Sequence, residues 1–576
     1  MGEAGSEGSE SAVGRVLGTE DATPLNFWVA LAPDQYLQLD DVVVTERAVP
    51  GREPVTLSGV VSQVRARHEG ARYDSDVFLI EDGVLPAEVI ESAEVMTTRV
   101  EPEMFVPPLP GSEVRRATNE ERDHALYFDQ MAKKLPIGLG RDGEPLYLNL
   151  EFIDGTRGAH VNISGISGVA TKTTYATFLL YSLFNSGVLG ADAVNTKALI
   201  FNVKGEDLLF LDHANAKLSQ DDVERYQTLN LPSGPFDSVA IYAPPRKGDP
   251  NAGPDVATRT TGVDTFYWTI AEFVDEELLP FVFADAEDDR NQYTMVIHNV
   301  SRRLQLDGRA IGDDGAWEVD GRKLTTYKEL VDLIVEKVQD DGSRYEWAGP
   351  ATGMGTVNAF IRRLLSSQRA IAALVRADIP LRARRRVSLS DAKVTIVDIH
   401  NLHDRAQRFV VGVTIRKAFE DKELRGARRP LLFLVLDELN KYAPREGTSP
   451  IKEILLDVAE RGRSLGVILL GAEQTASEIE RRVIANSAIR VVGRLDSAEA
   501  ARPEYGFLPA AHRQRATIAK PGTMFVSQPE IPVPLVAEFP FPAWATRPDE
   551  RDPSSGSGPA DPFSGFPDAA VPHAPQ

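Results

Sequence analysis

The pattern of hydrophobic and polar residues changes character several times along the 576-residue chain. Between residues 16 and 100, short runs rich in Val, Leu and aromatic residues alternate with Gly, Pro and Asp. Such spacing is typical of the strands of a small β-barrel or sandwich. The predicted strands cover residues 27–31, 36–46, 55–67 and 76–80. This region carries no catalytic set of residues, and we expect it to serve as an adaptor or in assembly.

After a proline-rich connector at residues 102–111, the pattern becomes one of buried strands and helices. A helix is predicted at residues 120–133 and a hairpin at residues 135–150. Continuous apolar runs, which are typical of strands buried on both faces, cover residues 197–211, 239–244, 393–402, 431–438, 467–474 and 488–495. Helices predicted at residues 405–420 and 451–465 complete an α/β pattern, which favours a parallel sheet.

Residues 261–373 interrupt the α/β pattern with apolar residues spaced by three and four, which indicates helices. Because this is too much helix for one crossover, we expect an all-α insertion. Its aromatic triplet Phe266-Tyr267-Trp268 could stack on bases, but a place in a helical core is the more common role. Residues 522–541 return to short β segments, and the Pro-, Ser- and Gly-rich tail is expected to be disordered.

Residues 160–180, HVNISGISGVATKTTYATFLL, predict a buried strand, a Gly-rich turn and a helix. This is the layout of a phosphate-binding loop, in which backbone N–H groups of the turn and of the helix N-terminus face an anion. Lys172 would meet the outer phosphates, and the Thr173 hydroxyl would ligate magnesium. The predicted nucleotide-binding residues are Gly165, Ser167, Gly168, Val169, Ala170, Thr171, Lys172, Thr173 and Thr174.

The loop departs from the usual pattern G-x-x-x-x-G-K-[ST]. Lys172 follows Gly165 by seven residues rather than six, and Thr171 stands where a glycine normally precedes the lysine. A longer loop must bulge, and threonine resists a positive φ. The alternative is therefore an ordinary strand–turn–helix connection that binds nothing.

A second stretch, LLFLVLDE at residues 431–438, favours nucleotide binding. It predicts a buried parallel strand whose acidic end reaches the site, since ligands bind at the carboxyl ends of such strands. Asp437 would hold magnesium, and Glu438 would polarise the attacking water. A strand with a solvated acidic end is the alternative, but the order of the two stretches makes coincidence the weaker explanation. ATP and Mg²⁺ are the expected cofactors, and the turn at residues 204–206 should lie near them.

Composition narrows the classes of function. The formal net charge of −22 argues against a general nucleic-acid coat protein, although a local basic channel is compatible with it. Basic clusters occur at residues 382–386, for which a solvated linker is favoured, and around Arg461 and Arg463. The absence of cysteine excludes disulfides and thiolate metal sites. No apolar run is long enough to span a bilayer and the N-terminus is not a signal peptide, so a cytoplasmic protein without membrane segments is expected.

Taken together, the chain resembles the HerA-like branch of the HerA/FtsK ATPases, which are bacterial and archaeal DNA-pumping motors. The resemblance covers most of residues 14–541. It rests on IGLGRDGEPLYLNL before HVNISG, on IFNVKGED, on LVLDELNKYAP and above all on ERGRSLGVILLGAEQ. The last stretch is similar to the family's helix with an arginine pair and the following strand, which ends in a sensor glutamine. Two departures are Asn202, where the family usually has aspartate, and Leu439-Asn440, where it often has Ala-His.

The resemblance implies an α/β fold: a P-loop, RecA-like ATPase core with an all-α insertion and a small N-terminal β-barrel. The expected division is a disordered start at 1–13, a barrel at 14–110, the first part of the core at 111–255, the insertion at 256–385, the second part of the core at 386–545 and a disordered tail at 546–576. It also implies a homo-oligomeric, hexameric ring that passes DNA through a central pore. Relatives commonly work with a nuclease, so a nuclease partner is a further expectation.

The resemblance also assigns roles to individual residues. Thr173 and Asp437 would be the metal ligands, and Glu438 the catalytic carboxylate. Gln474 would sense the γ-phosphate. Arg463, or less readily Arg461, would reach into the neighbouring subunit's site as a trans arginine finger.

The leading hypothesis is an ATP-driven DNA translocase or helicase in DNA-end processing or a defence-type system. One alternative is a nucleotide-binding scaffold that assembles a partner effector with weak or no hydrolysis, which the altered loop and the acidic charge favour. Another is a secretion or conjugation motor on a related core, although such motors often carry membrane segments and none is predicted here. The additional motifs of a conventional helicase are not visible in the sequence.

Overall fold

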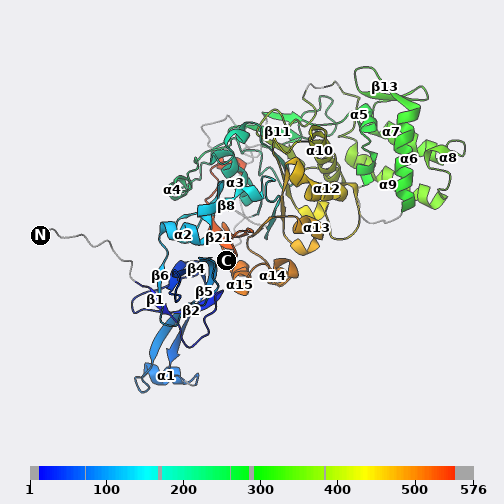
Figure 1. The fold of residues 1–576 in the computed structure, drawn as a ribbon. Helices are drawn as coiled ribbons and strands as arrows, with labels where there is room; N and C mark the ends of the chain where they lie inside the picture. Colours follow the sequence, from blue (N-terminus) through cyan, green and yellow to red (C-terminus); the bar gives the residue numbers. More distant parts are fainter. Residues whose placement is uncertain are drawn as a thin grey trace, which may run out of the picture.

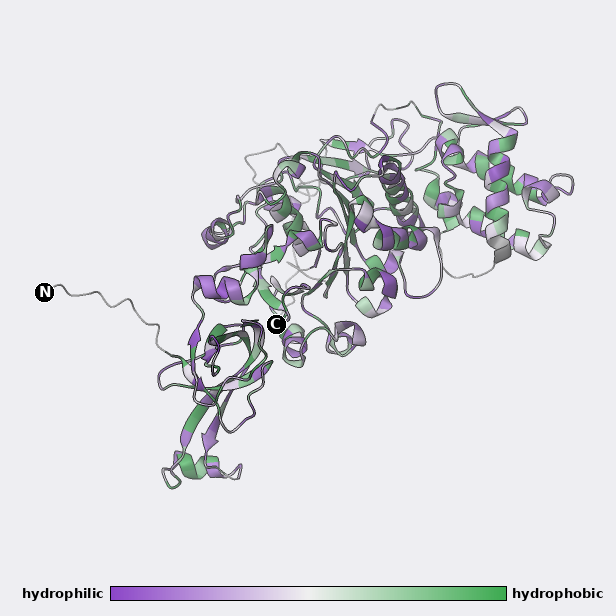
Figure 2. Ribbon diagram, in the orientation of Figure 1, coloured by the Kyte–Doolittle hydropathy of each residue, from purple (hydrophilic) through white to green (hydrophobic). Residues whose placement is uncertain are grey.

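The computed structural model describes residues 12–71, 73–166, 172–259, 261–283, 291–379, 381 and 384–551. Within these residues the chain forms a β-barrel at one end, a central α/β core and a largely helical insertion at the other end (Figure 1). This arrangement confirms the predicted fold class. Strands of the core are mostly hydrophobic, whereas its outer helices show both polar and apolar residues (Figure 2).

The N-terminal part is a closed barrel with the strand order β1-β2-β5-β4-β3-β6. Its strands are β1 (Gly14–Val16), β2 (Asn26–Leu31), β3 (Val42–Arg47), β4 (Val55–Glu69), β5 (Glu88–Glu101) and β6 (Glu113–Arg116). Because β6 closes the barrel, the barrel ends a few residues after position 110, which the sequence predicted as its end. Helix α2 (Asn119–Ala125), shorter than predicted, follows the barrel.

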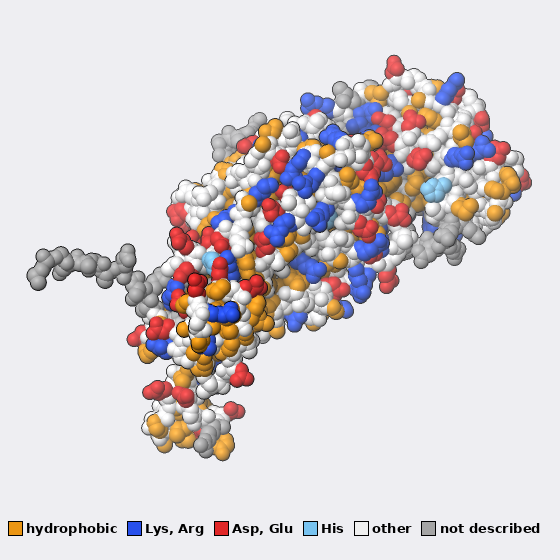
Figure 3. Space-filling view, viewed as in Figure 1, with side chains coloured by type: hydrophobic (Ala, Val, Ile, Leu, Met, Phe, Trp, Pro, Cys, Tyr) orange, Lys and Arg blue, Asp and Glu red, His pale blue; other side chains and the backbone are white. Residues whose placement is uncertain are grey.

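Strands β4 and β5 continue beyond the barrel as a long hairpin (Figure 1). The strand predicted at residues 76–80 is wrong, because these residues form the short helix α1 (Asp76–Glu81) at the tip of the hairpin. Their apolar character resembled that of a buried strand, but no residue of α1 is buried. Hydrophobic side chains, among them Tyr73, Phe78 and Val84, are exposed here and form an orange patch at the lower end of the molecule (Figure 3).

The core is built on a sheet that has 12 strands within the described residues, in the order β12-β11-β16-β10-β17-β18-β9-β19-β20-β21-β7-β8. The first eight are parallel, and the last four are antiparallel. The parallel strands are β9 (Val161–Ser164), β10 (Lys197–Asn202), β11 (Val239–Ala243), β12 (Val263–Thr265), β16 (Val394–Asp398), β17 (Leu432–Asp437), β18 (Val467–Glu473) and β19 (Ile489–Val492). The others are β7 (Lys134–Leu139), β8 (Pro145–Asn149), β20 (Thr523–Ser527) and β21 (Leu535–Glu538).

The parallel strands are buried on both faces, which explains their continuous apolar sequences. In β17, Leu434 and Leu436 belong to one hydrophobic cluster, whereas Phe433 and Val435 belong to another. Because successive side chains of a strand point to opposite faces, the two clusters lie on opposite sides of the sheet. Helix α3 (Lys172–Asn185) packs on one side, and α10 (Asp404–Arg425) and α12 (Pro450–Leu465) pack on the other.

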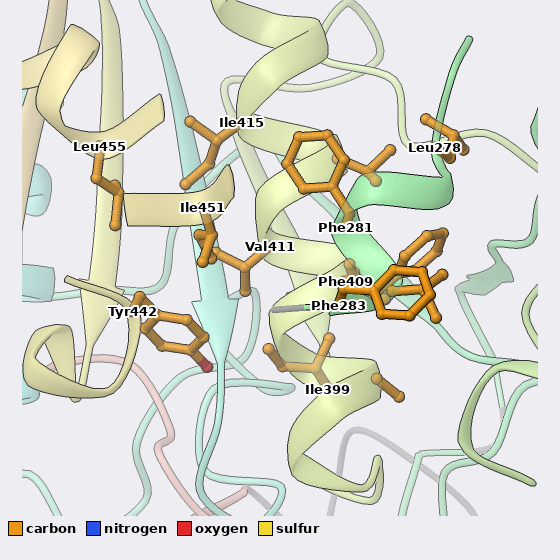
Figure 4. Packing of buried hydrophobic residues seen from close by; sticks show 14 of the residues in the cluster. Leu278, Phe281, Phe283, Ile399, Phe409, Val411, Ile415, Tyr442, Ile451 and Leu455 are labelled. Carbon is orange, nitrogen blue, oxygen red and sulfur yellow. The ribbon is translucent and has the colours of Figure 1, made fainter. Parts of the chain in front are cut away.

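The insertion contains α5 (Ile270–Asp275), α6 (Asn291–Asp307), α7 (Tyr327–Gln339), α8 (Arg344–Trp347) and α9 (Met354–Ile371). It also carries a three-stranded sheet that the sequence did not predict, formed by β13 (Gly308–Ile311), β14 (Ala316–Val319) and β15 (Arg322–Leu324). Since β12 still belongs to the core sheet, the insertion begins after Thr265. Trp268 and Phe273 lie against Phe409 of α10, with ring centroids 5.3 Å and 6.3 Å apart. Phe281 and Phe283 belong to the same hydrophobic cluster, which joins the insertion to the core (Figure 4).

The remaining short helices lie in connections of the core. They are α4 (Gln220–Thr228), α11 (Leu439–Tyr442), α13 (Arg481–Ala485), α14 (Ser497–Ala500) and α15 (Ala510–Ile518). The described chain ends at Arg551, six residues into the segment expected to be a disordered tail, and includes a 3₁₀ turn at Pro548–Glu550. No helix of the described residues is both long enough and apolar enough to cross a bilayer.

Candidate functional site

The predicted phosphate-loop strand and the predicted acidic strand lie in one sheet with a single strand between them. Strand β9 pairs with β18, and β18 pairs with β17, all in parallel. The carboxyl ends of the three strands therefore meet at the same edge of the sheet. This edge carries Lys172 and Thr173 at the start of α3, Asp437 and Glu438 at the end of β17, and Gln474 at the end of β18.

Lys172 is almost fully buried at the N-terminus of α3, with 2 % of its surface exposed. Its Nζ atom lies 3.7 Å from Asp437 Oδ1 and 3.8 Å from Glu438 Oε1, and it has no hydrogen-bond partner among the described residues. Burial lowers the pKa of this ammonium group, against the opposing effect of the Asp437 carboxylate. A buried cation without hydrogen bonds is costly. Phosphate oxygens would supply the missing acceptors, so the residue fits its predicted role.

Thr173 and Asp437 are the pair predicted to hold magnesium, and they are in direct contact. The Thr173 hydroxyl donates a hydrogen bond of 2.8 Å to Asp437 Oδ2. Hydroxyl and carboxylate oxygens are the ligands that Mg²⁺ takes from a protein when phosphates and water complete its shell. No cluster of three His, Asp, Glu or Cys ligands occurs in the described part of the chain, so a metal here would depend on the phosphates.

Glu438 follows Asp437 with a backbone φ of +56°, in the left-handed region that residues other than glycine seldom adopt. This conformation turns its carboxylate toward the end of β18, where Gln474 Nε2 donates a hydrogen bond of 3.0 Å to Glu438 Oε1. Burial alone would raise the pKa of Glu438, but the hydrogen bond from Lys204 and the charge of Lys172 hold it below its ordinary value. The side chain is thus ionised at neutral pH, as a general base must be.

Lys204 belongs to the site, although the sequence indicated only that its turn lies nearby. Its Nζ atom contacts Glu438 Oε1 and lies 3.3 Å from Asp437 Oδ2. Burial would lower the pKa of Lys204, but the two carboxylates raise it above its ordinary value. The signal that could have assigned it is a cation two residues after the end of β10, because β10 is the neighbour of β17.

Asn202, at the end of β10, has a structural reason to differ from the family's aspartate. Its Nδ2 atom donates to Asp398 Oδ1 at 2.8 Å and to the Gly205 carbonyl at 2.7 Å. Asp398 is buried and also accepts a hydrogen bond from His400 Nδ1 at 2.9 Å. A second carboxylate at position 202 would repel Asp398, whereas the amide donates to it.

Leu439 is the second departure from the family pattern, and it packs against the neighbouring strand. A Cβ atom at Gly471 of β18 would come within 2.4 Å of Leu439 Cδ2. Leu439 therefore fills the space that a glycine leaves in β18, and the pair fixes the start of α11 directly behind Glu438.

Glu473, beside Gln474, was not predicted from the sequence. Its side chain is fully buried and accepts a hydrogen bond of 2.7 Å from Ser164 Oγ, at the end of β9. Burial raises the pKa of Glu473 to about 8. At neutral pH the carboxyl is therefore protonated in the folded protein, which avoids a further negative charge close to Asp437.

This protonation predicts a pH-dependent stability. Between the ordinary pKa of 4.5 and about 8, the folded protein holds a proton that the unfolded chain releases. The contribution of Glu473 to the free energy of unfolding therefore falls as the pH rises, by about 1.4 kcal/mol per pH unit. The variant Glu473→Gln should melt at the wild-type temperature near pH 5 and increasingly above it toward pH 8. A difference in melting temperature that does not vary with pH would contradict this assignment.

A C-terminal segment also contributes to the site, which the sequence did not predict. It runs antiparallel to residues 213–216, with Asn215 N donating to the Ala543 carbonyl at 3.0 Å and Ala545 N to the His213 carbonyl at 2.8 Å. A cavity of about 130 Å³ beside Lys172, Thr173 and Asp437 is lined by members of this segment: Phe541, Pro542, Trp544, Thr546, Arg547 and Glu550. The aromatic and proline content of residues 539–544 was the signal of a buried segment.

The remaining predicted residues of the loop are only partly described. Gly165 N donates to the Glu473 carbonyl at 3.0 Å, and Thr174 lines the cavity beside Lys172. Ser167, Gly168, Val169, Ala170 and Thr171 lie outside the described residues.

Arg461 and Arg463 are distant from this edge within the chain. Both lie in the last turn of α12, just before β18 begins at Val467, whereas Gln474 follows its other end. Seven residues of extended strand put roughly 20 Å between the two edges. Arg461 pairs with Glu423 and lies over the Phe419 ring, whereas Arg463 is exposed and donates one hydrogen bond of 3.0 Å to the Thr156 carbonyl. Neither arginine reaches the site of its own chain.

The predicted α/β architecture, with a small N-terminal β-barrel, agrees with the structure. Neither a family model nor a curated protein matches the chain. Solved structures similar to it include VirB4 of Thermoanaerobacter pseudethanolicus, which is 16 % identical with a TM-score of 0.43, over 71 % of this chain and 96 % of that one. The plasmid coupling protein TrwB in complex with ADP and Mg²⁺ is 11 % identical with a TM-score of 0.47, over 76 % of this chain and 95 % of that one.

A third similar structure is the genome packaging NTPase B204 from Sulfolobus turreted icosahedral virus 2, in complex with ATP-gammaS. It is 14 % identical with a TM-score of 0.21, over 26 % of this chain and 70 % of that one. The roles of individual residues rest on the geometry of this chain.

Proposed function

We propose that the protein is an ATP-hydrolysing motor that translocates or unwinds DNA as a homo-oligomeric ring. The observation that carries the proposal is the joint placement of Thr173 against Asp437 and of Gln474 against Glu438. The Lys172 ammonium group lies near both carboxylates and makes no hydrogen bond to a described residue. A strand end with a solvated carboxylate, the alternative for residues 431–438, would not need a buried lysine or a hydrogen-bonded glutamine.

Each residue of the site has its own expected role in phosphoryl transfer. Bound ATP would supply the bond that is cleaved, and Mg²⁺ would neutralise part of the charge on the phosphates. Lys172 would bind the outer phosphates, and Thr173 and Asp437 would hold the metal. Glu438 would accept a proton from the attacking water. Gln474, predicted to sense the γ-phosphate, donates a hydrogen bond to Glu438 and would also orient it.

Lys204 would keep the site inactive while no nucleotide is bound. Its contact with Glu438 and Asp437 neutralises the two carboxylates that the reaction requires. We expect Lys204 to leave Glu438 for the phosphates when a nucleotide enters, which frees the base only in the loaded site.

The exposed Arg463 supports a ring in which each site is completed by the next subunit. It lies far from the site of its own chain. Its side chain donates to one backbone carbonyl, whereas Arg461 forms an ion pair with Glu423. An arginine supplied in trans can raise turnover by orders of magnitude, because it stabilises charge on the transferred phosphoryl group.

The variant Arg463→Ala should therefore bind ATP and assemble normally but hydrolyse ATP at least about tenfold more slowly. Mixing it with Lys172→Ala subunits, which keep Arg463, should restore part of the turnover at interfaces that combine one intact arginine with one intact phosphate site. Arg461→Ala is the matched control and should be affected less. Steady-state hydrolysis at a series of mixing ratios is the measurement, and the absence of any rescue would contradict a role in trans.

Displacement of a third DNA strand from a linear triplex tests the motor function itself. We expect ATP-dependent release of the third strand by the wild-type protein and none by Glu438→Gln. Hydrolysis without release would contradict translocation along DNA, and the absence of both would support the nucleotide-binding scaffold that assembles a partner effector. A hexamer, a nuclease partner and a place in DNA-end processing or defence remain parts of the proposal that follow from the HerA-like resemblance.

A further inference from the structure

The cavity beside Lys172, Thr173 and Asp437 is too small to hold a whole nucleotide. Its volume is about 130 Å³, whereas sites that enclose a small molecule measure roughly 300–1,000 Å³. Only part of a bound nucleotide would therefore occupy this space. Its position beside Thr173 and Asp437 indicates that this part is the phosphates with their metal. Any further cation in the lining would then meet phosphate oxygens.

Arg547, in the C-terminal segment, is such a cation. It lines the cavity, its side chain is exposed, and it forms no ion pair or hydrogen bond with a described residue. Lys204, which lines the same cavity, contacts Glu438 and lies 3.3 Å from Asp437 Oδ2. Because the Arg547 side chain is exposed, a ligand can reach it without any rearrangement of the core.

The carboxylates of the lining leave Arg547 available to a ligand. Burial raises the pKa of Asp207, and the charge of Arg547 opposes that rise without forming an ion pair. Glu550 accepts hydrogen bonds from Thr546 N at 2.9 Å and from Thr546 Oγ1 at 2.8 Å. Arg547 thus lies close enough to act on a charged group of the cavity, and its guanidinium group can still take an anion from outside the chain.

The backbone on both sides of Arg547 is anchored to an earlier part of the chain. Before it, Ala545 N donates to the His213 carbonyl at 2.8 Å, and after it, Ala216 N donates to the Glu550 carbonyl at 2.8 Å. A side chain on an anchored backbone loses less freedom when it binds a ligand than one on a free loop. The C-terminal segment therefore presents Arg547 to the cavity from a fixed position.

We propose that Arg547 binds the phosphates of the nucleotide in the site of its own chain, with its guanidinium group beside the metal that Thr173 and Asp437 would hold. Arginine suits this role because its fork of N–H donors matches two oxygens of a phosphate. A bound nucleotide would also hold the C-terminal segment more firmly against the core, since Arg547 would connect the two. This inference rests on the ATPase function proposed above, and it adds a cation that acts within the chain, whereas Arg463 would act on the next subunit.

Equilibrium binding of ATP and of ADP to the full chain in the presence of Mg²⁺ tests this role. Arg547→Ala should weaken binding of ATP by about tenfold, and Arg547→Lys should recover part of the loss, because lysine keeps the charge but not the fork. An equal loss for ADP places the guanidinium group on a phosphate that both nucleotides share, and a loss for ATP alone places it on the terminal phosphate. Arg425→Ala, at an exposed arginine in the last turn of α10, is the control and should bind both nucleotides as the wild type does.

Amide hydrogen exchange distinguishes a contact with the nucleotide from a structural role. Saturating ATP should slow exchange at residues 541–547 of the wild type, and it should slow it much less in Arg547→Ala. The melting temperature of this variant without nucleotide should equal that of the wild type, because Arg547 has no ion pair to lose. A lower melting temperature with unchanged ATP affinity would show that Arg547 only offsets the charge of Asp207, and the proposal would be overturned.

Lys172→Ala, measured in the same titrations, separates this inference from the proposed function. Loss of ATP binding in Lys172→Ala, together with unchanged affinity in Arg547→Ala, would overturn the role of Arg547 and leave the ATPase site in place. Failure of the wild-type chain to bind ATP would overturn both.

Discussion

The variant Glu438→Gln is expected to bind ATP with an affinity within a few-fold of the wild-type value and to hydrolyse it roughly 10²–10⁴-fold more slowly. The amide keeps the size of the side chain and accepts a hydrogen bond from Gln474, but it cannot take a proton from water. It also removes a negative charge 3.8 Å from Lys172, which should favour the phosphates rather than oppose them. The measurements are steady-state hydrolysis and equilibrium binding of a fluorescent ATP analogue.

Glu453→Gln, at an exposed glutamate of α12, is the matched control and should keep wild-type turnover. Loss of affinity without loss of the maximal rate in Glu438→Gln would show that Glu438 contributes to binding. In that case Glu438 would not be the residue that activates water.

The second large effect is expected at Lys172. Its ammonium group lies 3.7 Å from Asp437 Oδ1 and 3.8 Å from Glu438 Oε1 but makes no hydrogen bond within the described structure. The hydrogen bonds that its replacement removes are therefore those formed with phosphate. A charge-assisted hydrogen bond contributes about 1.5–3 kcal/mol, and about 1.4 kcal/mol corresponds to a tenfold change in affinity. Lys172→Ala should therefore weaken ATP binding by at least about tenfold to a hundredfold.

A companion variant distinguishes loss of a contact from loss of the fold. Lys172→Met keeps most of the apolar side chain but removes the buried charge, whose burial lowers the pKa of Lys172. It should melt at or above the wild-type temperature without nucleotide, and ATP should no longer raise that temperature. Lys328→Ala, at an exposed lysine of α7, is the control. Unchanged ATP affinity in both Lys172 variants would remove the phosphate-loop assignment.

The residues whose places in the sheet could be predicted from the sequence share a physical reason. Asp437 and Gln474 follow continuous apolar runs, and such runs form parallel strands whose carboxyl ends meet at one edge of the sheet. The closeness of Asp437 and Gln474 in space therefore follows from the hydrophobic pattern of the sequence alone. Thr173 was placed by the phosphate-loop pattern, and its contact with Asp437 agrees with that placement.

Other features depend on packing that no local pattern carries. The apolar residues of α1 look like a strand, and only the length of the β4–β5 hairpin puts them beyond any core. Glu473 reads as one more polar residue at a strand end, yet β18 lies between β9 and β17, which buries it completely. The C-terminal segment reaches the site through hydrogen bonds to residues 213–216, more than 300 positions earlier in the chain.

The most direct test of the account is the rate of ATP hydrolysis by the purified full chain, with and without linear double-stranded DNA, with Glu438→Gln as the blank. The account predicts Mg²⁺-dependent turnover above the blank that increases when DNA is added. Tight ATP binding with no turnover above the blank under either condition would contradict it, and the protein would then be a nucleotide-binding scaffold rather than a motor.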